Sequence, residues 1–305
     1  VVLSGSSTLN KGLDNLSITT AGDVVLTTDT KEKVTIDTNK IATLMADKAK
    51  EISVKGGENS TISAKEATKA SINLGTNTKV LTVGSNGLDK VEDLSLANLK
   101  LAAALTATKL VKINVKDVDF NGAQIATDEE KVDLTTNYTE KGTAKLQANH
   151  ATQLTIHANG EKESTIEFVS PHNKLEKVTF DGNAKDLKIN LQQETVLKDV
   201  NAASFTGNFA ELKVKNIAGS QVLLGSGNDV IDIDNTTAEQ TINGGAGTDL
   251  ISISTTIAGA GADKVTLKNF EGIRINNAIA NDIDMSKWEG FNNITLAQGS
   301  GVYAL

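Results

Sequence analysis

Short stretches in which apolar and polar residues strictly alternate run through the whole chain, and they limit what it can fold into. Examples are KVTID (33–37), EISVKG (51–56), QLTIHA (153–158) and LISIS (250–254). Each stretch is four to eight residues long with a period of two, which indicates a β-strand with one buried face. Asn, Gly, Asp, Ser and Thr separate the stretches, and these residues form turns. The pattern predicts an all-β chain.

Two architectures accommodate many short strands, a pair of packed sheets (a β-sandwich) and a parallel β-solenoid. The spacing is irregular, and no repeat length can be assigned over residues 1–215. Many stretches share one frame, an apolar-x-apolar pair followed by Asn, Asp or Gly, as in SINLGTN and TFDGN. This favours a parallel β-solenoid, a β-helix-like stack of strands, with little helix. Only residues 41–52 and 97–110, rich in Ala, Leu and Lys, could form short helices instead.

The bulk composition excludes several classes of protein. Aromatic residues make up 3% of the chain, so Val, Ile, Leu and Ala must fill the core, as suits stacked rows of small side chains. Cysteine is absent, which rules out disulfides and thiolate metal sites. The net charge is −8 and Arg274 is the single arginine, which argues against a nucleic-acid partner. No apolar run approaches the roughly 18–20 residues of a membrane span.

The N-terminal residues VVLSGSS include neither Met nor a charged segment, so they do not resemble a signal peptide. We therefore expect the chain to be a fragment, or a matured product, of a longer protein.

Three glycine-aspartate windows stand in the last third of the chain. They are LGSGNDVID (224–232), GGAGTDLIS (244–252) and AGAGADKVT (258–266). All three follow the template G-G-x-G-x-D-x-U-x, where U is a large apolar residue, which is the nonapeptide of calcium-binding parallel β-rolls. The middle window fits at every defined position, and the other two depart from the template only at the first.

This composition suits a calcium site. A turn that directs backbone carbonyls at a cation needs backbone angles that glycine adopts readily. Calcium takes 6–8 oxygen ligands, so two stacked turns would share each ion. The candidate residues supply either backbone freedom or a carboxylate: Gly225, Gly227, Asp229, Asp232, Asp234, Gly244, Gly245, Gly247, Asp249, Gly259, Gly261 and Asp263. After each window, apolar residues alternate with polar ones and should stack inward.

Spacing limits the number of sites. A regular roll returns to the same edge after two nonapeptides. The step from Asp229 to Asp249 is two positions longer than that, and the step from Asp249 to Asp263 is four positions shorter. We expect one calcium site between the first two turns. A second site would combine Asp263 with Asp232 or Asp234. The competing interpretation is that the windows are ordinary hairpin turns.

Catalytic motifs are absent from the sequence. The three histidines, His150, His157 and His172, form no H-E-x-x-H, and there is no G-x-S-x-G or cysteine nucleophile. Paired carboxylates for glycoside cleavage stay open as an alternative, because 38 acidic residues make accidental pairs plentiful. The lack of catalytic motifs favours a protein that is not an enzyme.

The nonapeptides resemble those of RTX-type surface-layer (S-layer) proteins of Gram-negative bacteria. The segment 201–233 is similar in style, with a small-residue turn, a strand and then a glycine-aspartate repeat, and LKNFEGIRINN (267–277) resembles the strand that follows such repeats. The specific motifs cover about the last ninety residues. The resemblance implies a β-solenoid-like region over 1–215 and a calcium-binding RTX β-roll with C-terminal strands over 216–305.

The resemblance also implies a function. Such proteins are secreted by a type I apparatus with an uncleaved C-terminal signal and fold outside the cell when they bind calcium. They assemble with copies of themselves into a two-dimensional lattice on the cell surface, and attach to lipopolysaccharide through a separate N-terminal domain that is not in this chain. The alternatives are a secreted RTX adhesin that binds a host or matrix ligand, and a β-solenoid enzyme acting on carbohydrate.

Overall fold

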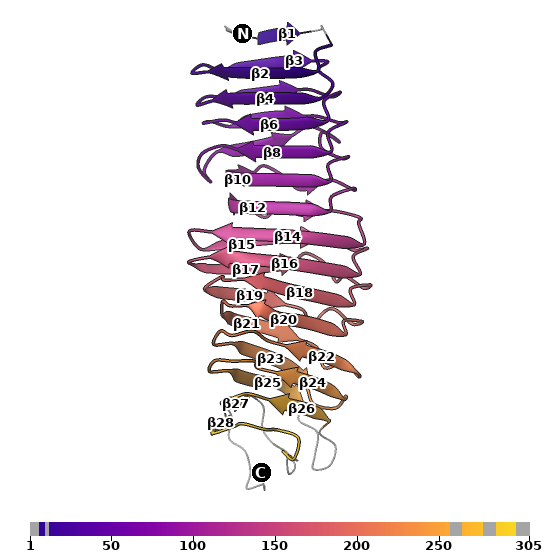
Figure 1. Ribbon diagram of the computed structural model, residues 1–305, viewed down its shortest axis with the longest axis vertical. Helices are drawn as coiled ribbons and strands as arrows, with labels where there is room; N and C mark the ends of the chain where they lie inside the picture. The colour runs from indigo at the N-terminus through magenta and orange to yellow at the C-terminus, as the bar shows by residue number, and fades with distance from the viewer. Residues whose placement is uncertain (1–5, 10–11, 257–263, 277–284, 297–305) are drawn as a thin grey trace. The chain divides into compact units, whose positions relative to one another are not determined.

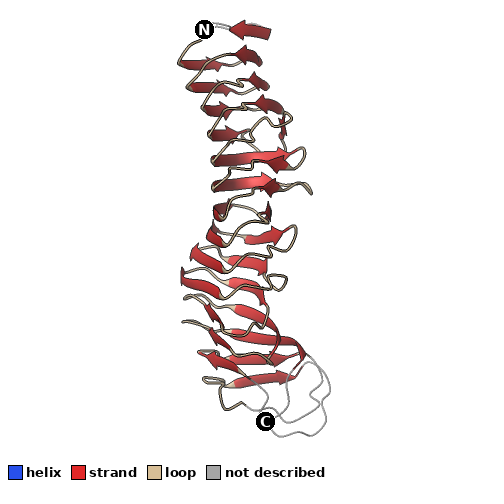
Figure 2. Cartoon of the chain, turned by 90° about the vertical axis from the view of Figure 1, so that its right-hand side faces the viewer, coloured by secondary structure: helices blue, strands red, loops and turns tan. Residues whose placement is uncertain are grey.

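The computed structural model describes residues 6–9, 12–256, 264–276 and 285–296. Within those ranges, all the regular secondary structure is β-strand. The strands pair in parallel and stack as a β-solenoid of about 13 turns (Figure 1). Figure 2 shows only strands and connecting loops in the described chain. The prediction of an all-β parallel solenoid is therefore confirmed. Within the described ranges, no helix is long and apolar enough to cross a membrane.

The chain divides into two compact units, Val1–Ala151 and Thr152–Leu305, each with its own stacked strands. The boundary predicted between the solenoid-like region (1–215) and the calcium-binding roll (216–305) falls inside the second unit, and it stays a prediction.

In the first unit, each circuit of the chain forms one layer, here called a rung. Its strands are β1 (Ser6–Leu9), β2 (Asn15–Thr20), β3 (Val24–Thr28), β4 (Lys33–Thr38), β5 (Ala42–Met45), β6 (Glu51–Lys55), β7 (Ser60–Ser63), β8 (Lys69–Asn73), β9 (Val80–Val83), β10 (Asp93–Leu101), β11 (Leu105–Thr106), β12 (Lys112–Asp119), β13 (Ile125–Ala126), β14 (Lys131–Tyr138) and β15 (Gly142–Gln147).

A regular repeat that the residue types alone do not reveal governs β2 to β8. Their first residues lie nine positions apart, and the register pairs Asn15 with Lys33, Lys33 with Glu51 and Glu51 with Lys69. Each rung therefore consists of two halves, and each half is one nonapeptide in length. The even-numbered strands stack on one face and the odd-numbered strands on another. What repeats is the order of inward and outward positions, not the residue types. The repeat is therefore hard to see in the sequence.

Inward side chains stack in rows from rung to rung. Ile18, Ile36, Val54 and Ile72 form one such row, and each is at most 2% exposed. Full burial of one Val, Leu or Ile contributes roughly 1.5–3 kcal/mol, so each rung stabilises its neighbours. These rows are the core of the unit.

The segments that could have formed helices are strands. Residues 41–52 lie in β5, in the start of β6 and in the corner between them, and 97–110 lie in the end of β10, in β11 and in the turns that follow each. Ala42, at the start of β5, and Ala46 and Ala49, in the corner after it, are fully buried. Stacking against two rungs outweighs the modest helix preference of Ala.

Outward side chains of opposite charge alternate along one column of the first unit. In register from rung to rung it contains Lys33, Glu51, Lys69, Asp93 and Lys112. The amine of Lys33 lies 2.7 Å from the Glu51 carboxylate, and that of Lys69 lies 3.3 Å from Asp93. Each exposed pair contributes at most about 1 kcal/mol. The alternation nevertheless fixes the register, because a slipped rung would bring like charges together.

The second unit continues the same kind of pairing with larger rungs. Its strands are β16 (Gln153–Gly160), β17 (Glu163–Phe168), β18 (Lys177–Gly182), β19 (Asp186–Asn190), β20 (Asp199–Phe205), β21 (Phe209–Val214), β22 (Ser220–Leu223), β23 (Val230–Asn235), β24 (Gln240–Asn243), β25 (Leu250–Thr256), β26 (Val265–Lys268), β27 (Gly272–Ile275) and β28 (Asn293–Leu296).

Aromatic side chains fill the wider core of this unit. Phe180, Phe205 and Phe209 are fully buried, and the ring of Phe209 lies 5.1 Å from that of Phe180 and 4.7 Å from that of Phe205. Even-numbered strands from β16 to β26 form one face, and odd-numbered strands from β17 to β27, with β28, form the other. The glycine-aspartate turns lie at one edge of the second face.

Candidate calcium-binding turns

The first two glycine-aspartate turns lie one above the other. Residues 225–229 lead into β23 and residues 244–249 lead into β25, and these strands pair with Val230 opposite Leu250. The offset between Asp229 and Asp249 places both turns at one edge of the sheet, as the spacing predicts. The apolar residues behind them also stack as predicted, with Ile231 opposite Ile251 and Ile233 opposite Ile253, all at most 1% exposed.

Glycine is required in these turns because consecutive rungs touch through their backbones. A Cβ atom on Gly227 would lie 1.9 Å from the carbonyl oxygen of Gly207, and one on Gly247 would lie 2.1 Å from that of Gly227. Gly247 also has a φ of +139°, which side chains other than glycine rarely adopt. The turns at 207, 227 and 247 thus form one stack in which carbonyl oxygens face the next rung.

The same stacking explains the remaining predicted glycines. Gly225 packs against the carbonyl of Phe205, Gly245 against that of Gly225, and Gly244 against that of Asn269.

The two aspartates of the turns point inward. Asp229 is 0% exposed and Asp249 is 2% exposed. The backbone N–H of Phe209 donates to Oδ1 of Asp229 at 2.8 Å, and the N–H of Asp229 donates to Oδ1 of Asp249 at 2.8 Å. Each carboxylate therefore joins its rung to the preceding one. The second oxygen, Oδ2, of both aspartates is buried without a hydrogen-bond partner among the described residues.

These surroundings penalise the charged form of both carboxyl groups. Burial raises the pKa of Asp229 to about 6, although the backbone N–H groups of Phe209 and Gly225 act against the rise. Burial raises the pKa of Asp249 to about 7, and the negative charges of Asp229 and Glu271 add to the rise. Two carboxylates that lose their solvation and repel each other would be stabilised by a cation.

Glu271, which the sequence windows did not include, follows Asp249 at this edge. Its Oε2 accepts the backbone N–H of Asp249 at 2.7 Å, so Glu271 joins its rung to the preceding one as Asp249 does through Asp229. Glu271 belongs to the N-F-E segment 269–271, which leads into β27. Its position in a strand-leading turn, 22 residues after Asp249, is the signal that could have identified it.

The third window lies only partly within the described residues. Gly259, Gly261 and Asp263 lie outside the described residues. The strand that follows them, β26, pairs with β24 on the opposite face from β23 and β25, with Leu267 opposite Ile242. Val265 and Leu267 point inward as expected, and both are 0% exposed, but they stack on the other face from Ile251 and Ile253. The composition of the window does not reveal which face its strand joins.

Asp232 and Asp234 lie on the strand after the first turn, on the outward side of β23, and both are half-buried. Oδ1 of Asp234 accepts the backbone N–H of Asn216 at 2.7 Å. Their expected partner Asp263 is not among the described residues, so the second calcium site stays a prediction.

The donor set of the stacked turns suits calcium if backbone oxygens take part. Within the described ranges, no group of three or more His, Cys, Asp or Glu side chains converges on one point. The side of Gly244 that lacks a Cβ is approached by the carbonyl oxygen of Asn269 and by Oδ2 of Asp249, at 2.2 and 2.7 Å from the position a Cβ would take. Buried carboxylate oxygens and carbonyls from adjacent rungs are the ligand types that calcium prefers.

Comparisons with protein-family models, with characterised proteins and with solved structures found no match to this chain. The class that the structure itself establishes is the parallel β-solenoid.

Proposed function

We propose that this chain is a structural subunit of a calcium-dependent bacterial surface layer, a protective coat at the outside of the cell. One observation carries the calcium requirement: Asp229 and Asp249 are buried on consecutive rungs, and each has one carboxylate oxygen without a partner. The lattice itself is supported by the resemblance of the glycine-aspartate repeats to those of surface-layer proteins.

The residues that would hold the ion are Asp229 and Asp249, through their Oδ2 atoms, with backbone carbonyls of the stacked glycine turns. A bound calcium ion would supply the positive charge that two buried carboxylates need. The ion bridges rungs that exist only in the folded chain, so its binding free energy becomes folding free energy. Folding of these turns would then follow export into a medium rich in calcium. Extracellular calcium modules bind at about 10⁻⁴–10⁻³ M, which suits such a switch.

Stacked rungs also suit a building block. Rows of buried side chains and cross-rung ion pairs make each unit a regular stack of rungs with sheet faces. Copies of the chain would meet through these faces in a two-dimensional lattice. Attachment to lipopolysaccharide would use a region outside this chain.

The test is electron microscopy of the purified protein with calcium and with chelator. We expect ordered sheets in about 1–10 mM calcium, because these concentrations match or exceed the dissociation constants of extracellular calcium modules. The sheets should disperse in EDTA and should not return with magnesium, which prefers a smaller octahedral site.

Two variants make the test specific. Asp249→Ala should require more calcium for both folding and sheet formation, because it removes a ligand. Asp199→Ala is the matched control, since Asp199 pairs with Lys177 at 2.8 Å on the outside of the same unit. Monomers that are indifferent to chelator would refute the proposal, and calcium dependence unchanged by Asp249→Ala would refute the assigned ligand.

A further inference from the structure

The odd-numbered strands of the first unit present an outer surface without charged side chains. The outward residues of β3, β5, β7 and β9 are Val25, Thr27, Thr43, Met45, Thr61, Ser63, Val80 and Thr82. The register stacks them in columns, with Val25 opposite Thr43 and Thr43 opposite Thr61. None of them is charged, although charged residues make up 22% of the chain. We call this surface the neutral face.

The even-numbered strands of the same rungs differ, because their outward residues include many charges. At the two ends of these strands, β4 has Lys33 and Asp37, and β6 has Glu51 and Lys55. Thr and Val favour β-strands in general. Strand preference alone would therefore place them equally on both faces, so the lack of charge on the neutral face requires another explanation.

Large apolar side chains are exposed on the neutral face. Met45 is 52% exposed, the highest fraction among the large apolar side chains that the structure describes, and Ile41, directly before β5, is 40% exposed. Val25 and Val80 of the same face are half-buried. Scattered apolar side chains on a surface need no explanation, whereas a group of them on one face marks a contact site.

Charged side chains lie along both ends of these strands. Glu58 and Lys79 pair at 2.6 Å just before β7 and β9, at the same edge as Asp23, which lies just before β3. Asp47 and Lys65 pair at 2.7 Å just after β5 and β7. An uncharged centre with a polar rim is the arrangement typical of protein–protein interfaces.

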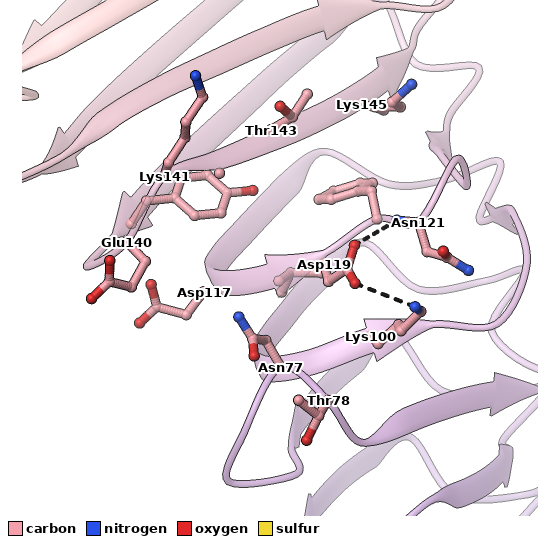
Figure 3. A pocket seen from close by; sticks show the side chains of 14 residues that line it. Asn77, Thr78, Lys100, Asp117, Asp119, Asn121, Glu140, Lys141, Thr143 and Lys145 are labelled. Carbon is pink, nitrogen blue, oxygen red and sulfur yellow. Dashed lines mark hydrogen bonds and ion pairs between the residues drawn. The ribbon is translucent and has the colours of Figure 1, made fainter.

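The neutral face ends beyond β9 at a charged pocket. Lys100 of β10 follows Val80 in register, and its amine lies 3.5 Å from the carboxylate of Asp119 on β12. Figure 3 shows this pair, with Asp117 and Glu140 on the wall of the same pocket. The neutral face therefore does not continue along the solenoid past β9.

A second copy of this chain fits the neutral face for two reasons. The net charge of −8 makes copies repel one another, and a face without charges is where that repulsion is weakest. The strands of stacked rungs lie about 4.7–4.9 Å apart, so two neutral faces have the same spacing of side-chain rows. Rows of one copy can then fit between rows of the other, as in two packed sheets. A partner without stacked rungs lacks this match.

We propose that the neutral face binds the neutral face of a second copy, so that two first units pack sheet against sheet around a two-fold axis. The contact rests on the proposed function in one respect, that copies meet through their sheet faces. It does not require calcium at the glycine-aspartate turns, because it involves the first unit alone.

The size of the neutral face makes this contact a weak one. Strands of four or five residues on four rungs cover roughly 300 Å² per copy, at about 4.8 Å between strands and about 3.3 Å per residue. A standard interface covers about 800 Å² per partner, so we expect a dissociation constant on the order of 10⁻⁴ M. Such a contact suffices in a lattice, where each copy is held by several neighbours at once.

The test is sedimentation equilibrium of the full chain in EDTA, at concentrations from about 10 μM to about 0.5 mM, which bracket the expected dissociation constant. EDTA keeps the proposed calcium lattice dispersed. The mean mass should rise with concentration from that of one chain toward that of two. Met45→Lys and Thr43→Lys should each weaken the association by about tenfold or more, because each places like charges opposite one another in the contact.

Val111→Lys is the matched control. Val111 is also an exposed apolar residue of the first unit, at 37%, but it lies directly before β12 and outside the neutral face. The variant makes the same change of charge and should associate as the unaltered chain does. Circular dichroism should show the same strand content in all three variants.

A chain that stays monomeric up to about 0.5 mM would overturn the proposal, and so would equal association of the three lysine variants. A monomer that instead binds phosphatidylcholine vesicles, and loses that binding in Met45→Lys, would assign the face to a lipid surface and overturn the proposal as well. Calcium-dependent sheets from a chain that is monomeric in EDTA would refute this contact and leave the surface-layer proposal standing. Dimers in EDTA without sheets in calcium would support this contact and refute the lattice.

Discussion

Replacing Asp249 by Asn should stabilise the protein without calcium at pH 8 and remove most of its response to calcium. The substitution keeps the shape of the side chain. Oδ1 of the new amide can still accept the backbone N–H of Asp229, which lies 2.8 Å from the carboxylate oxygen. Only the negative charge and the unpartnered Oδ2 are lost.

The size of the effect without calcium follows from the pKa of Asp249. Burial raises it from 3.8 to about 7. A carboxyl group whose pKa is higher in the folded state contributes stability below its unfolded pKa, and that contribution is lost as pH rises to the folded pKa. A tenfold change in proton affinity corresponds to about 1.4 kcal/mol, so Asp249 lowers the free energy of unfolding by up to about 4 kcal/mol between pH 4 and pH 7. Asparagine has no such dependence.

Calcium should narrow the difference in stability between the two proteins. If the unaltered site binds with a dissociation constant of about 10⁻⁴ M, 10 mM calcium stabilises it by about 2.7 kcal/mol. The variant lacks one of the two carboxylates and should gain much less. In EDTA, the variant should therefore be more stable than the unaltered protein at pH 8 and equally stable at pH 4. Added calcium should stabilise the variant less than it stabilises the unaltered protein.

Thermal unfolding followed by circular dichroism, at pH 4 and pH 8 with EDTA and then across a calcium titration, measures all three comparisons. About 4 kcal/mol corresponds to a rise of about 10 °C in the unfolding midpoint of a unit of this size. A variant that melts below the unaltered protein in EDTA at pH 8, yet gains as much from calcium, would refute the reasoning. It would mean that Asp249 is a structural cap for the Asp229 N–H and nothing more.

Three other substitutions test the fold, each by urea unfolding at fixed calcium. Gly227→Ala should destabilise the second unit by more than about 2 kcal/mol, because the new methyl group would lie 1.9 Å from a carbonyl oxygen of the previous rung. Gly12→Ala is its control and should cost far less, because the nearest atom to the new methyl group is 3.7 Å away. Leu44→Ala should cost about 2–5 kcal/mol because Leu44 is fully buried, whereas Met45→Ala, at a residue 52% exposed, should stay within about 0.5 kcal/mol. Glu51→Lys would place three lysines in succession along the charged column. It should lower the free energy of unfolding by about 1 kcal/mol in low salt and by less in 1 M salt. A loss of stability independent of salt would show that charge is not the cause.

Much of the fold can be predicted from the sequence because a solenoid is specified locally. Every second residue of a strand faces the core, so apolar alternation in a single stretch identifies a strand and its inward side. The nonapeptide spacing is harder to see because one inward column can hold unlike residues. Val24, Ala42 and Ser60 occupy equivalent positions on successive rungs, and all three are buried. Such a column is recognised only when the rungs are stacked.

The candidate site is predictable only in part, for the same reason. The composition of two turns and the offset between them identify Asp229 and Asp249 as neighbours. Glu271 completes the line of carboxylates from a turn without the glycine pattern, so no search for that pattern finds it. The third window matches the pattern but leads to a strand on the other face. Which face a strand joins depends on the path of the corner before it, and a nonapeptide motif contains no information on that path.

The glycine-aspartate turns arrange charge in the opposite way to the ion pairs on the outside of both units. In the first unit, carboxylates point outward and meet lysines of the next rung, as Glu32 meets Lys50 at 2.8 Å and Asp47 meets Lys65 at 2.7 Å. Those pairs stay in contact with water and need no further partner. In the second unit, Asp229 and Asp249 point inward, where no lysine accompanies them among their described contacts and each retains an unpartnered oxygen. A buried carboxylate must be protonated or meet a cation. We expect the first arrangement to be insensitive to calcium, and the second to make the stability of its turns depend on a cation or on low pH. The proposed requirement for the ion would therefore be a property of a few stacked turns rather than of the solenoid fold.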